Sequence, residues 1–220
     1  MFRYLLVICL SVCVLSCQNK KNQNSCCTRF HEDGKVKPVV AIAPLIDSTS
    51  YEIPWSLSDE ITSQIRAIVA NLNTLYIPSK ELCDKLSTTQ NPFSSDLSWV
   101  KEAYPTQEFV VFIELIQHEN VPVKGYQGQQ MAPLDVSSNL QMAARLRVID
   151  NRGASPKIIL QEIVKDSYYT PKTILRTDYN RISWGSEEYR SSPMALAHAE
   201  LAKSISARIH DYVFLSTVGR

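Results

Sequence analysis

Val39-Val40-Ala41-Ile42-Ala43-Pro44-Leu45-Ile46 is an unbroken apolar run that ends at Asp47 and a Ser/Thr turn. A strand that is apolar on both faces is typical of a sheet covered on two sides. We therefore expect a central strand here. Pro44 has no N–H to donate, so we expect hydrogen bonding of this strand to stop near it.

The residues that follow predict a helix and a second strand. Ser58 can cap a helix whose apolar residues recur at helical spacing, namely Ile61, Ile65, Ile68, Val69 and Leu72. Leu75–Pro78 then supplies a short strand. Strand, helix and strand in this order predict a crossover with parallel pairing.

Later segments predict two short helices and three further strands. The helices are expected at Lys80–Leu86 and Leu97–Ala103. Glu108–Gln117 is mostly apolar, whereas Leu140–Val148 alternates with period two, as a strand with one wet face does. An Asn-Arg-Gly turn leads into Ile158–Asp166, which predicts an antiparallel hairpin.

A long helix is expected to end the chain, from Ser192-Pro193 to about Phe214. Its apolar stripe favours packing on a sheet, and its polar face has few cations for the alternative of a membrane-surface helix. The stripe comprises Met194, Ala197, Leu201, Ile205, Ile209 and Tyr212. The predicted fold is α/β, a single mixed sheet of about five strands with a parallel β-α-β start, an antiparallel C-terminal hairpin and packed helices.

The first 17 residues have the layout of a bacterial export signal. Arg3 precedes an apolar run from Tyr4 to Leu15, and Val14-Leu15-Ser16-Cys17 resembles a lipobox. We expect residues 1–16 to be a signal peptide and Cys17 to carry acyl chains, such as palmitate, that hold the protein on the membrane. An Asp directly after the lipidated cysteine would resemble an inner-membrane retention signal, but this chain has Gln18 there. We therefore expect the protein to lie on the outer membrane, facing the periplasm.

Two alternatives to lipidation stay open. An uncleaved anchor would need about 20 apolar residues to span a bilayer, more than this run offers. Cleavage at another site would release a soluble secreted protein. Under the lipoprotein interpretation, residues 17–37 are a polar, flexible tether and residues 38–220 a single globular domain.

Charge and cysteine content limit the range of partners and cofactors. Loss of Arg3 leaves 22 of 23 basic side chains against 22 acidic ones, so no general attraction to nucleic acid is expected. Cys26, Cys27 and Cys83 cannot all pair within one chain, which leaves an intermolecular disulfide or free thiols. Cys26 and Cys27 with His31 lack a fourth zinc ligand, so no metal or other cofactor is expected.

Val39–Ser48 and the helix from Ser58 resemble the small α/β domain of bacterial envelope proteins such as the TolB amino-terminal domain, CsgG and the penicillin-binding-protein activator lipoproteins. The lax lipobox, the low glycine content and the segment Trp184–Tyr189 resemble uncharacterised lipoproteins of chlamydiae. The resemblance implies an envelope role. A CsgG-like pore would require amphipathic insertion strands, but Asn120–Ser138 is polar.

No arrangement for catalysis stands out, and we expect no enzyme. His31, His118, His198 and His210 are far apart in the chain, no serine lies in a Gly-x-Ser-x-Gly motif, and no glycine-rich phosphate loop is present. The paired carboxylates of Glu187 and Glu188 are more typical of a solvated loop than of a binding site.

Two loops are the candidates for function, Asn120–Ser138 and Thr177–Ser192. The second gathers residue types that anchor protein interfaces, namely Tyr179, Arg181, Trp184, Tyr189 and Arg190. Alternatively, Trp184 and Tyr189 cover the end of the sheet. We expect a non-catalytic periplasmic domain that contacts an envelope protein in assembly, secretion or cell-wall regulation, with a homo-oligomer left open. The alternative is a ligand- or glycan-binding lipoprotein.

Overall fold

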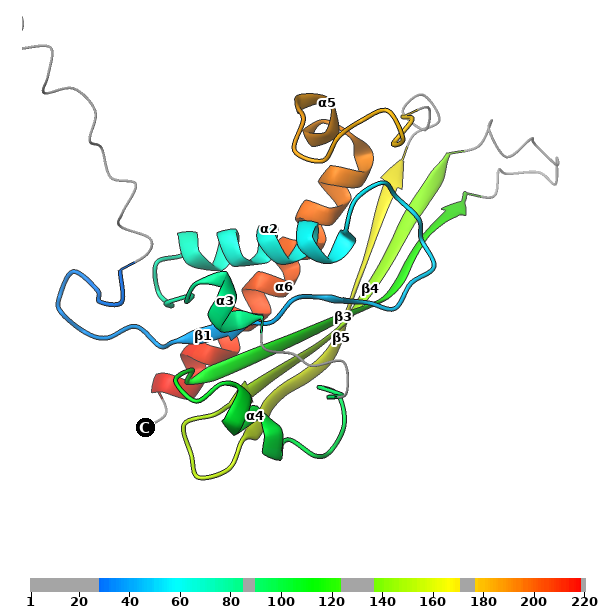
Figure 1. Ribbon diagram of the computed structural model, residues 1–220. Helices are drawn as coiled ribbons and strands as arrows, with labels where there is room; N and C mark the ends of the chain where they lie inside the picture. Colours follow the sequence, from blue (N-terminus) through cyan, green and yellow to red (C-terminus); the bar gives the residue numbers. More distant parts are fainter. Residues whose placement is uncertain (1–27, 85–89, 124–136, 171–176, 219–220) are drawn as a thin grey trace, which may run out of the picture.

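The computed structural model describes residues 28–84, 90–123, 137–170 and 177–218. Five strands form one mixed sheet in the order β1-β3-β4-β5, with β2 also paired to β3 (Figure 1). The strands are β1 (Val40–Ile42), β2 (Ile46–Asp47), β3 (Phe109–Pro122), β4 (Ser138–Asp150) and β5 (Lys157–Thr170). The first two run parallel to β3 and the remaining pairs are antiparallel, which confirms the predicted fold class.

The first predicted strand is divided in two at Pro44. Between β1 and β2 the chain leaves β3, and the backbone of Leu45 bonds instead to side chains of the following helix. The Leu45 N–H donates to Thr62 Oγ1 at 2.9 Å, and the Leu45 carbonyl accepts from Ser58 Oγ at 2.6 Å. The predicted strand at Leu75–Pro78 is reduced to one parallel bridge between Val39 and Tyr76.

The β3–β4 hairpin is longer than predicted. Its register runs from Phe109 opposite Asp150 to Pro122 opposite Ser138, with an irregularity between Leu115 and Gln117. The extra residue at this bulge reverses the alternation of side chains between the two faces. The central part of the predicted Asn120–Ser138 loop, residues 124–136, lies outside the described residues.

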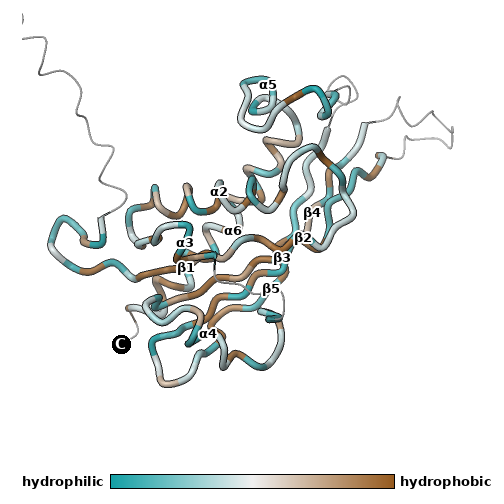
Figure 2. Tube along the Cα trace, viewed as in Figure 1, coloured by the Kyte–Doolittle hydropathy of each residue, from teal (hydrophilic) through white to brown (hydrophobic). Residues whose placement is uncertain are grey.

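Helices α2 (Leu57–Asn71) and α6 (Pro193–Val218) cover one face of the sheet (Figure 1). The cap of α2 is Ser56, whose Oγ accepts from the Asp59 N–H, and not the predicted Ser58. The predicted stripe of α6 is buried except for the partly buried Tyr212. Figure 2 shows the hydrophobic colour concentrated on the strands beneath these helices.

The other face of the sheet is covered near β1 by α3 (Lys80–Cys83) and α4 (Ser98–Ala103). Arg147 on β4 is buried and fastens the segment before α4 to the sheet. Its guanidinium donates to the carbonyls of Pro92 at 2.7 Å and Phe93 at 2.9 Å. The short helix α5 (Glu187–Arg190) lies beside the N-terminal end of α6.

The structure describes ten residues ahead of Pro38, the predicted start of the domain. Residues 28–37, assigned by the prediction to the tether, fold into a small hairpin with Phe30 opposite Val36. Lys37 is fully buried and its Nζ donates to Asn73 Oδ1 at 2.6 Å. The hairpin is thereby joined to the C-terminal end of α2.

Candidate surface recess

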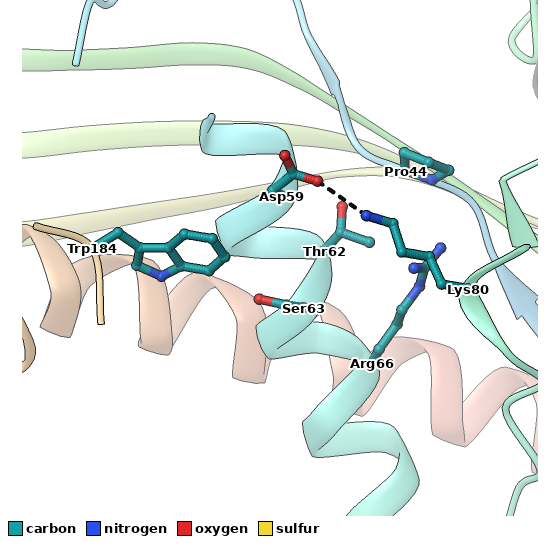
Figure 3. A pocket seen from close by; sticks show the side chains of 7 residues that line it. All are labelled: Pro44, Asp59, Thr62, Ser63, Arg66, Lys80 and Trp184. Atoms are coloured by element: carbon teal, nitrogen blue, oxygen red, sulfur yellow. Dashed lines mark ion pairs between the residues drawn. The ribbon is translucent and has the colours of Figure 1, made fainter. Parts of the chain in front are cut away.

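A recess of about 390 Å³ opens beside α2, at the point where the chain leaves β1 (Figure 3). The break at Pro44 and the hydrogen bonds of Leu45 to α2 shape its floor. Trp184, from the loop before α5, stands at one side of it in Figure 3. The lining residues are Pro44, Asp59, Thr62, Ser63, Arg66, Lys80 and Trp184.

The charged side chains of the recess differ in how firmly hydrogen bonds and ion pairs hold them. Arg66 is fixed, because its Nε donates to the Ile42 carbonyl at 3.0 Å and its guanidinium also pairs with Asp84 at 2.8 Å. Lys80 Nζ lies 3.6 Å from Asp59 Oδ1, and both side chains are largely exposed. Exposed ion pairs of this kind contribute little to stability. Lys80 and Asp59 can therefore separate and bind charged groups of a ligand instead.

The loop that carries Trp184 is tightly held although the indole is 42% exposed. Gly185 has a φ of 84°, a conformation that glycine adopts without strain. The Gly185 carbonyl accepts from Arg190 Nε at 3.2 Å, and Ser186 Oγ accepts from the Tyr189 N–H at 3.1 Å. The indole is therefore presented from a fixed support.

That support is joined through Tyr189 to a buried polar network. Glu60 of α2 and His198 of α6 are fully buried, with 2.7 Å between Glu60 Oε1 and His198 Nδ1. The Tyr189 hydroxyl donates to the same carboxylate oxygen, and Trp55 Nε1 donates to the other at 2.7 Å. The network links α2, α5 and α6.

His118 extends the network to β3. Its Nε2 lies 2.8 Å from His198 Nε2, and its Nδ1 has no partner among the described residues. An ionised Glu60 only accepts, so His198 Nδ1 donates to it, and one of the two Nε2 atoms carries the proton that joins the His118 and His198 rings. The Tyr51 ring packs on His118 with a centroid distance of 4.2 Å.

Burial and hydrogen bonding shift the pKa values of these groups in different directions. Burial alone would raise the pKa of Glu60, but hydrogen bonds from His198, Tyr189 and Trp55 lower it overall. Burial and the adjacent His198 lower the pKa of His118 to about 4. Burial and the bond to Glu60 raise the pKa of Tyr189. At neutral pH the network therefore holds an ionised Glu60, a neutral His118 and a protonated Tyr189 hydroxyl.

The structure separates the five residues predicted to contact a partner. Trp184 borders the recess, and Arg181 is exposed at a second hollow of about 430 Å³ near Asp178 and Glu188. Arg190 is exposed but bonds within its own loop. Tyr189 is 2% exposed and Tyr179 packs on the core. The Tyr189 ring is thus engaged in the interior, where its hydroxyl bonds to Glu60.

Sequence reasoning missed Glu60, Arg66 and Lys80. Glu60 and Arg66 occupy an ordinary amphipathic helix, and no local signal distinguishes them from solvated charges. His118 and His198 were noted, but their meeting depends on the bulge in β3. The two histidines are 80 positions apart in the chain, so no local pattern predicts their contact.

Of the cysteines predicted to be lipidated or to form disulfides, only Cys83 lies among the described residues. Cys17, Cys26 and Cys27 lie outside the described residues. Cys83 is buried and free, and burial raises the pKa of its thiol. In the described part of the chain, no group of three or more His, Cys, Asp or Glu side chains could hold a metal ion. None of the helices described there has the length and apolar content to cross a membrane.

Fold and recess together define an α/β domain with a surface recess that is bordered by an exposed tryptophan and lined by one acidic and two basic side chains. The chain belongs to a family of unknown function, DUF7499, whose model matches residues 27–217. The comparison with curated proteins finds no match.

Several solved structures resemble the chain. The hypothetical protein CT253 from Chlamydia trachomatis is 24% identical, with a TM-score of 0.61 over 81% of this chain and 98% of that one. This likeness shows a shared fold. Lipoprotein GNA1162 from Neisseria meningitidis (11% identity, TM-score 0.40) matches over 80% of this chain and 98% of its own. The rare lipoprotein B from Shewanella oneidensis (14%, TM-score 0.36) matches over 81% and 97%.

Proposed function

We propose that the protein is a lipid-anchored component of the bacterial envelope whose non-catalytic domain acts through protein contacts. Acyl chains on Cys17 would hold it on the outer membrane, facing the periplasm. The observation that carries the proposal is the exposed Trp184 on a tightly held loop beside a charged recess. Tryptophan in such a setting is a typical anchor of protein interfaces.

The chemistry of the described residues supports binding in preference to catalysis. The titratable groups of the buried network whose pKa values are shifted, Glu60, His118 and Tyr189, are bonded to one another or to His198. At the recess, Thr62 Oγ1 accepts from Leu45 and Ser63 Oγ donates to the Glu60 carbonyl at 2.8 Å. Both hydroxyls are thus engaged by backbone, and the polar groups open to a partner are Lys80 and Asp59.

The test is to purify the full chain from membranes with and without Trp184→Ala and to identify co-purifying envelope proteins. Leu196→Ala is the matched control, because Leu196 is 44% exposed and lies on α6. We expect Trp184→Ala to lose a partner that the native chain and the control retain, with an unchanged melting temperature. Retention of the same partners by Trp184→Ala would refute a protein contact at this surface.

A second function, binding of a small ligand or glycan, is favoured by the volume of the recess. About 390 Å³ falls within the range of small-molecule sites, and an indole wall with adjacent charged groups suits a charged sugar. Such a ligand would raise the melting temperature of the native chain but not of Trp184→Ala. If no sugar or wall fragment in a screen raises it, this second function fails.

The resemblance of Val39–Ser48 to the TolB amino-terminal domain and CsgG supports a related role for this protein in the envelope. Assembly, secretion and cell-wall regulation are the processes it suggests. A homo-oligomer is compatible with it, and the mass of the detergent-extracted protein distinguishes a closed ring from a single copy.

A further inference from the structure

Several chain segments lie at the end of the domain where residue 28 enters (Figure 1). The Lys37–Asn73 bond joins the 28–37 hairpin to the end of α2. Arg152, in the turn after β4, donates to the Ser216 carbonyl at 3.1 Å. This bond joins the turn to the C-terminal end of α6. We call this the tether end of the domain.

The tether end concentrates exposed apolar side chains. Twelve large hydrophobic side chains are exposed among the described residues, and half of them lie here. Phe214, Leu215 and Val218 are 51%, 65% and 65% exposed, and their spacing places them side by side on α6. Phe30 and Val36 are 54% and 56% exposed and face each other across the hairpin bridge, and Leu72 follows α2. Apolar exposure gathered on three segments at one end of a domain is unusual for a surface that meets only water.

We propose that the tether end lies against the lipid bilayer, with these side chains entering its interfacial region. The inference rests on the proposed acylation of Cys17. Eleven residues from Cys17 to the first described residue span at most about 40 Å. The 26-residue helix α6 is itself about 39 Å long. Acyl chains on Cys17 would therefore keep this end within reach of the membrane, at a high effective concentration.

The charges at this end determine which lipids suit it. Basic and acidic side chains are interspersed there, namely Arg29, Lys35 and Lys157 with Glu32, Asp33 and Asp211. A surface of mixed charge gains little from anionic lipid, so apolar insertion is the main attraction. Contact with zwitterionic phospholipid is accordingly expected. The loop of Trp184 precedes the opposite end of α6 and would stay open to the periplasm.

Depth-dependent quenching tests the proposal on the full, acylated chain in phosphatidylcholine vesicles. Leu215→Trp and Leu196→Trp add an indole at exposed leucines near opposite ends of α6. The emission added to that of the native tryptophans is measured with and without brominated phosphatidylcholine. We expect the emission added at position 215 to be largely lost and that at position 196 to be unchanged. Val36→Trp provides a second position at the tether end, also expected to be quenched.

The outcomes separate this inference from the proposed function. Mass spectrometry of the extracted chain shows whether Cys17 is acylated. Absence of acylation overturns the anchor and this inference together. Acylation without quenching at positions 215 and 36, or with equal quenching at 196, overturns the membrane-facing end alone. Shielding of position 215 by a co-purifying protein, without quenching by bromolipid, would assign the tether end to a protein partner and would also overturn it.

Discussion

The Nε2 atoms of His118 and His198 lie 2.8 Å apart in the core, although β3 carries one ring and α6 the other. His198 also bonds to Glu60, and the same carboxylate oxygen accepts a hydrogen bond from the Tyr189 hydroxyl. One chain of hydrogen bonds therefore ties the sheet to α2, α5 and α6. Satisfied buried networks of this kind define a unique packing, and removal of one member leaves others without partners.

The neutral His118 makes stability depend on pH. The pKa of His118 is about 4 in the folded protein, below the ordinary value of 6.5. As pH falls below 6.5 the unfolded chain binds the proton first, so the contribution present above 6.5 is lost by pH 4. The free energy of unfolding should fall by up to about 3 kcal/mol across this window.

Urea unfolding at pH 7 and pH 4.5, followed by circular dichroism, measures the effect. His118→Gln keeps an amide donor near His198 but has no titratable group, so it should lose most of the pH dependence. An equally steep loss in His118→Gln would show that other groups, such as Glu60 with its lowered pKa, cause it.

Glu60→Gln should destabilise the fold strongly. The carboxylate accepts from His198, Tyr189 and Trp55, whereas an amide offers one acceptor and directs an N–H at groups that are themselves donors. We expect a loss of about 2–4 kcal/mol, measured by urea unfolding at pH 7. Asp59→Asn, on the exposed side of the same helix, should change stability by less than about 0.5 kcal/mol. Similar losses in both variants would contradict a special role for the buried carboxylate.

Arg147→Lys should loosen the segment before α4. An ammonium group has three donors at one point, whereas the planar guanidinium spreads its donors over the carbonyls of Pro92, Phe93 and Ser94 and also bonds Gln161. We expect a loss of about 2 kcal/mol and faster amide exchange for residues 91–96. The control, Arg145→Lys, alters a more exposed pair with Glu114 at 3.4 Å and should have little effect. Unchanged exchange at 91–96 in Arg147→Lys would be inconsistent with this anchoring.

Thr62→Val should destabilise the junction of β1 and β2. Valine keeps the shape of threonine but leaves the buried N–H of Leu45 without its acceptor, at a cost of about 1–3 kcal/mol. Thr62→Ser retains the hydroxyl and should cost less. Thermal unfolding of both variants tests this, and a serine variant no more stable than the valine variant would show that the methyl group matters and the hydrogen bond does not.

Burial periodicity made most elements predictable. A strand covered on both faces must be apolar throughout, as Val39–Ile46 is, and a helix on a sheet needs a stripe such as that of α6. The alternation over Leu140–Val148 marked β4 for the same reason. These patterns are local, so they survive without knowledge of the neighbouring elements.

Other features depend on contacts between distant segments. The first strand divides because Thr62 and Ser58 offer Leu45 better partners than β3 does. β3 extends to Pro122, past the predicted end at Gln117, because β4 supplies its hydrogen bonds. The predicted partner residues separate because Tyr189 finds a carboxylate in the core whereas Trp184 does not, and neither fact is visible in the loop sequence.

The sequence by itself determined the α/β class, the order of the main strands and helices and the lipobox-like pattern that ends at Cys17, since hydrophobic spacing and local motifs act over a few residues. Tertiary structure alone decided the bulge that turns His118 inward, the burial of Glu60 and the recess beside Trp184. The physical reason is that a buried charge or a surface hollow exists only when segments far apart in the chain supply its partners and walls.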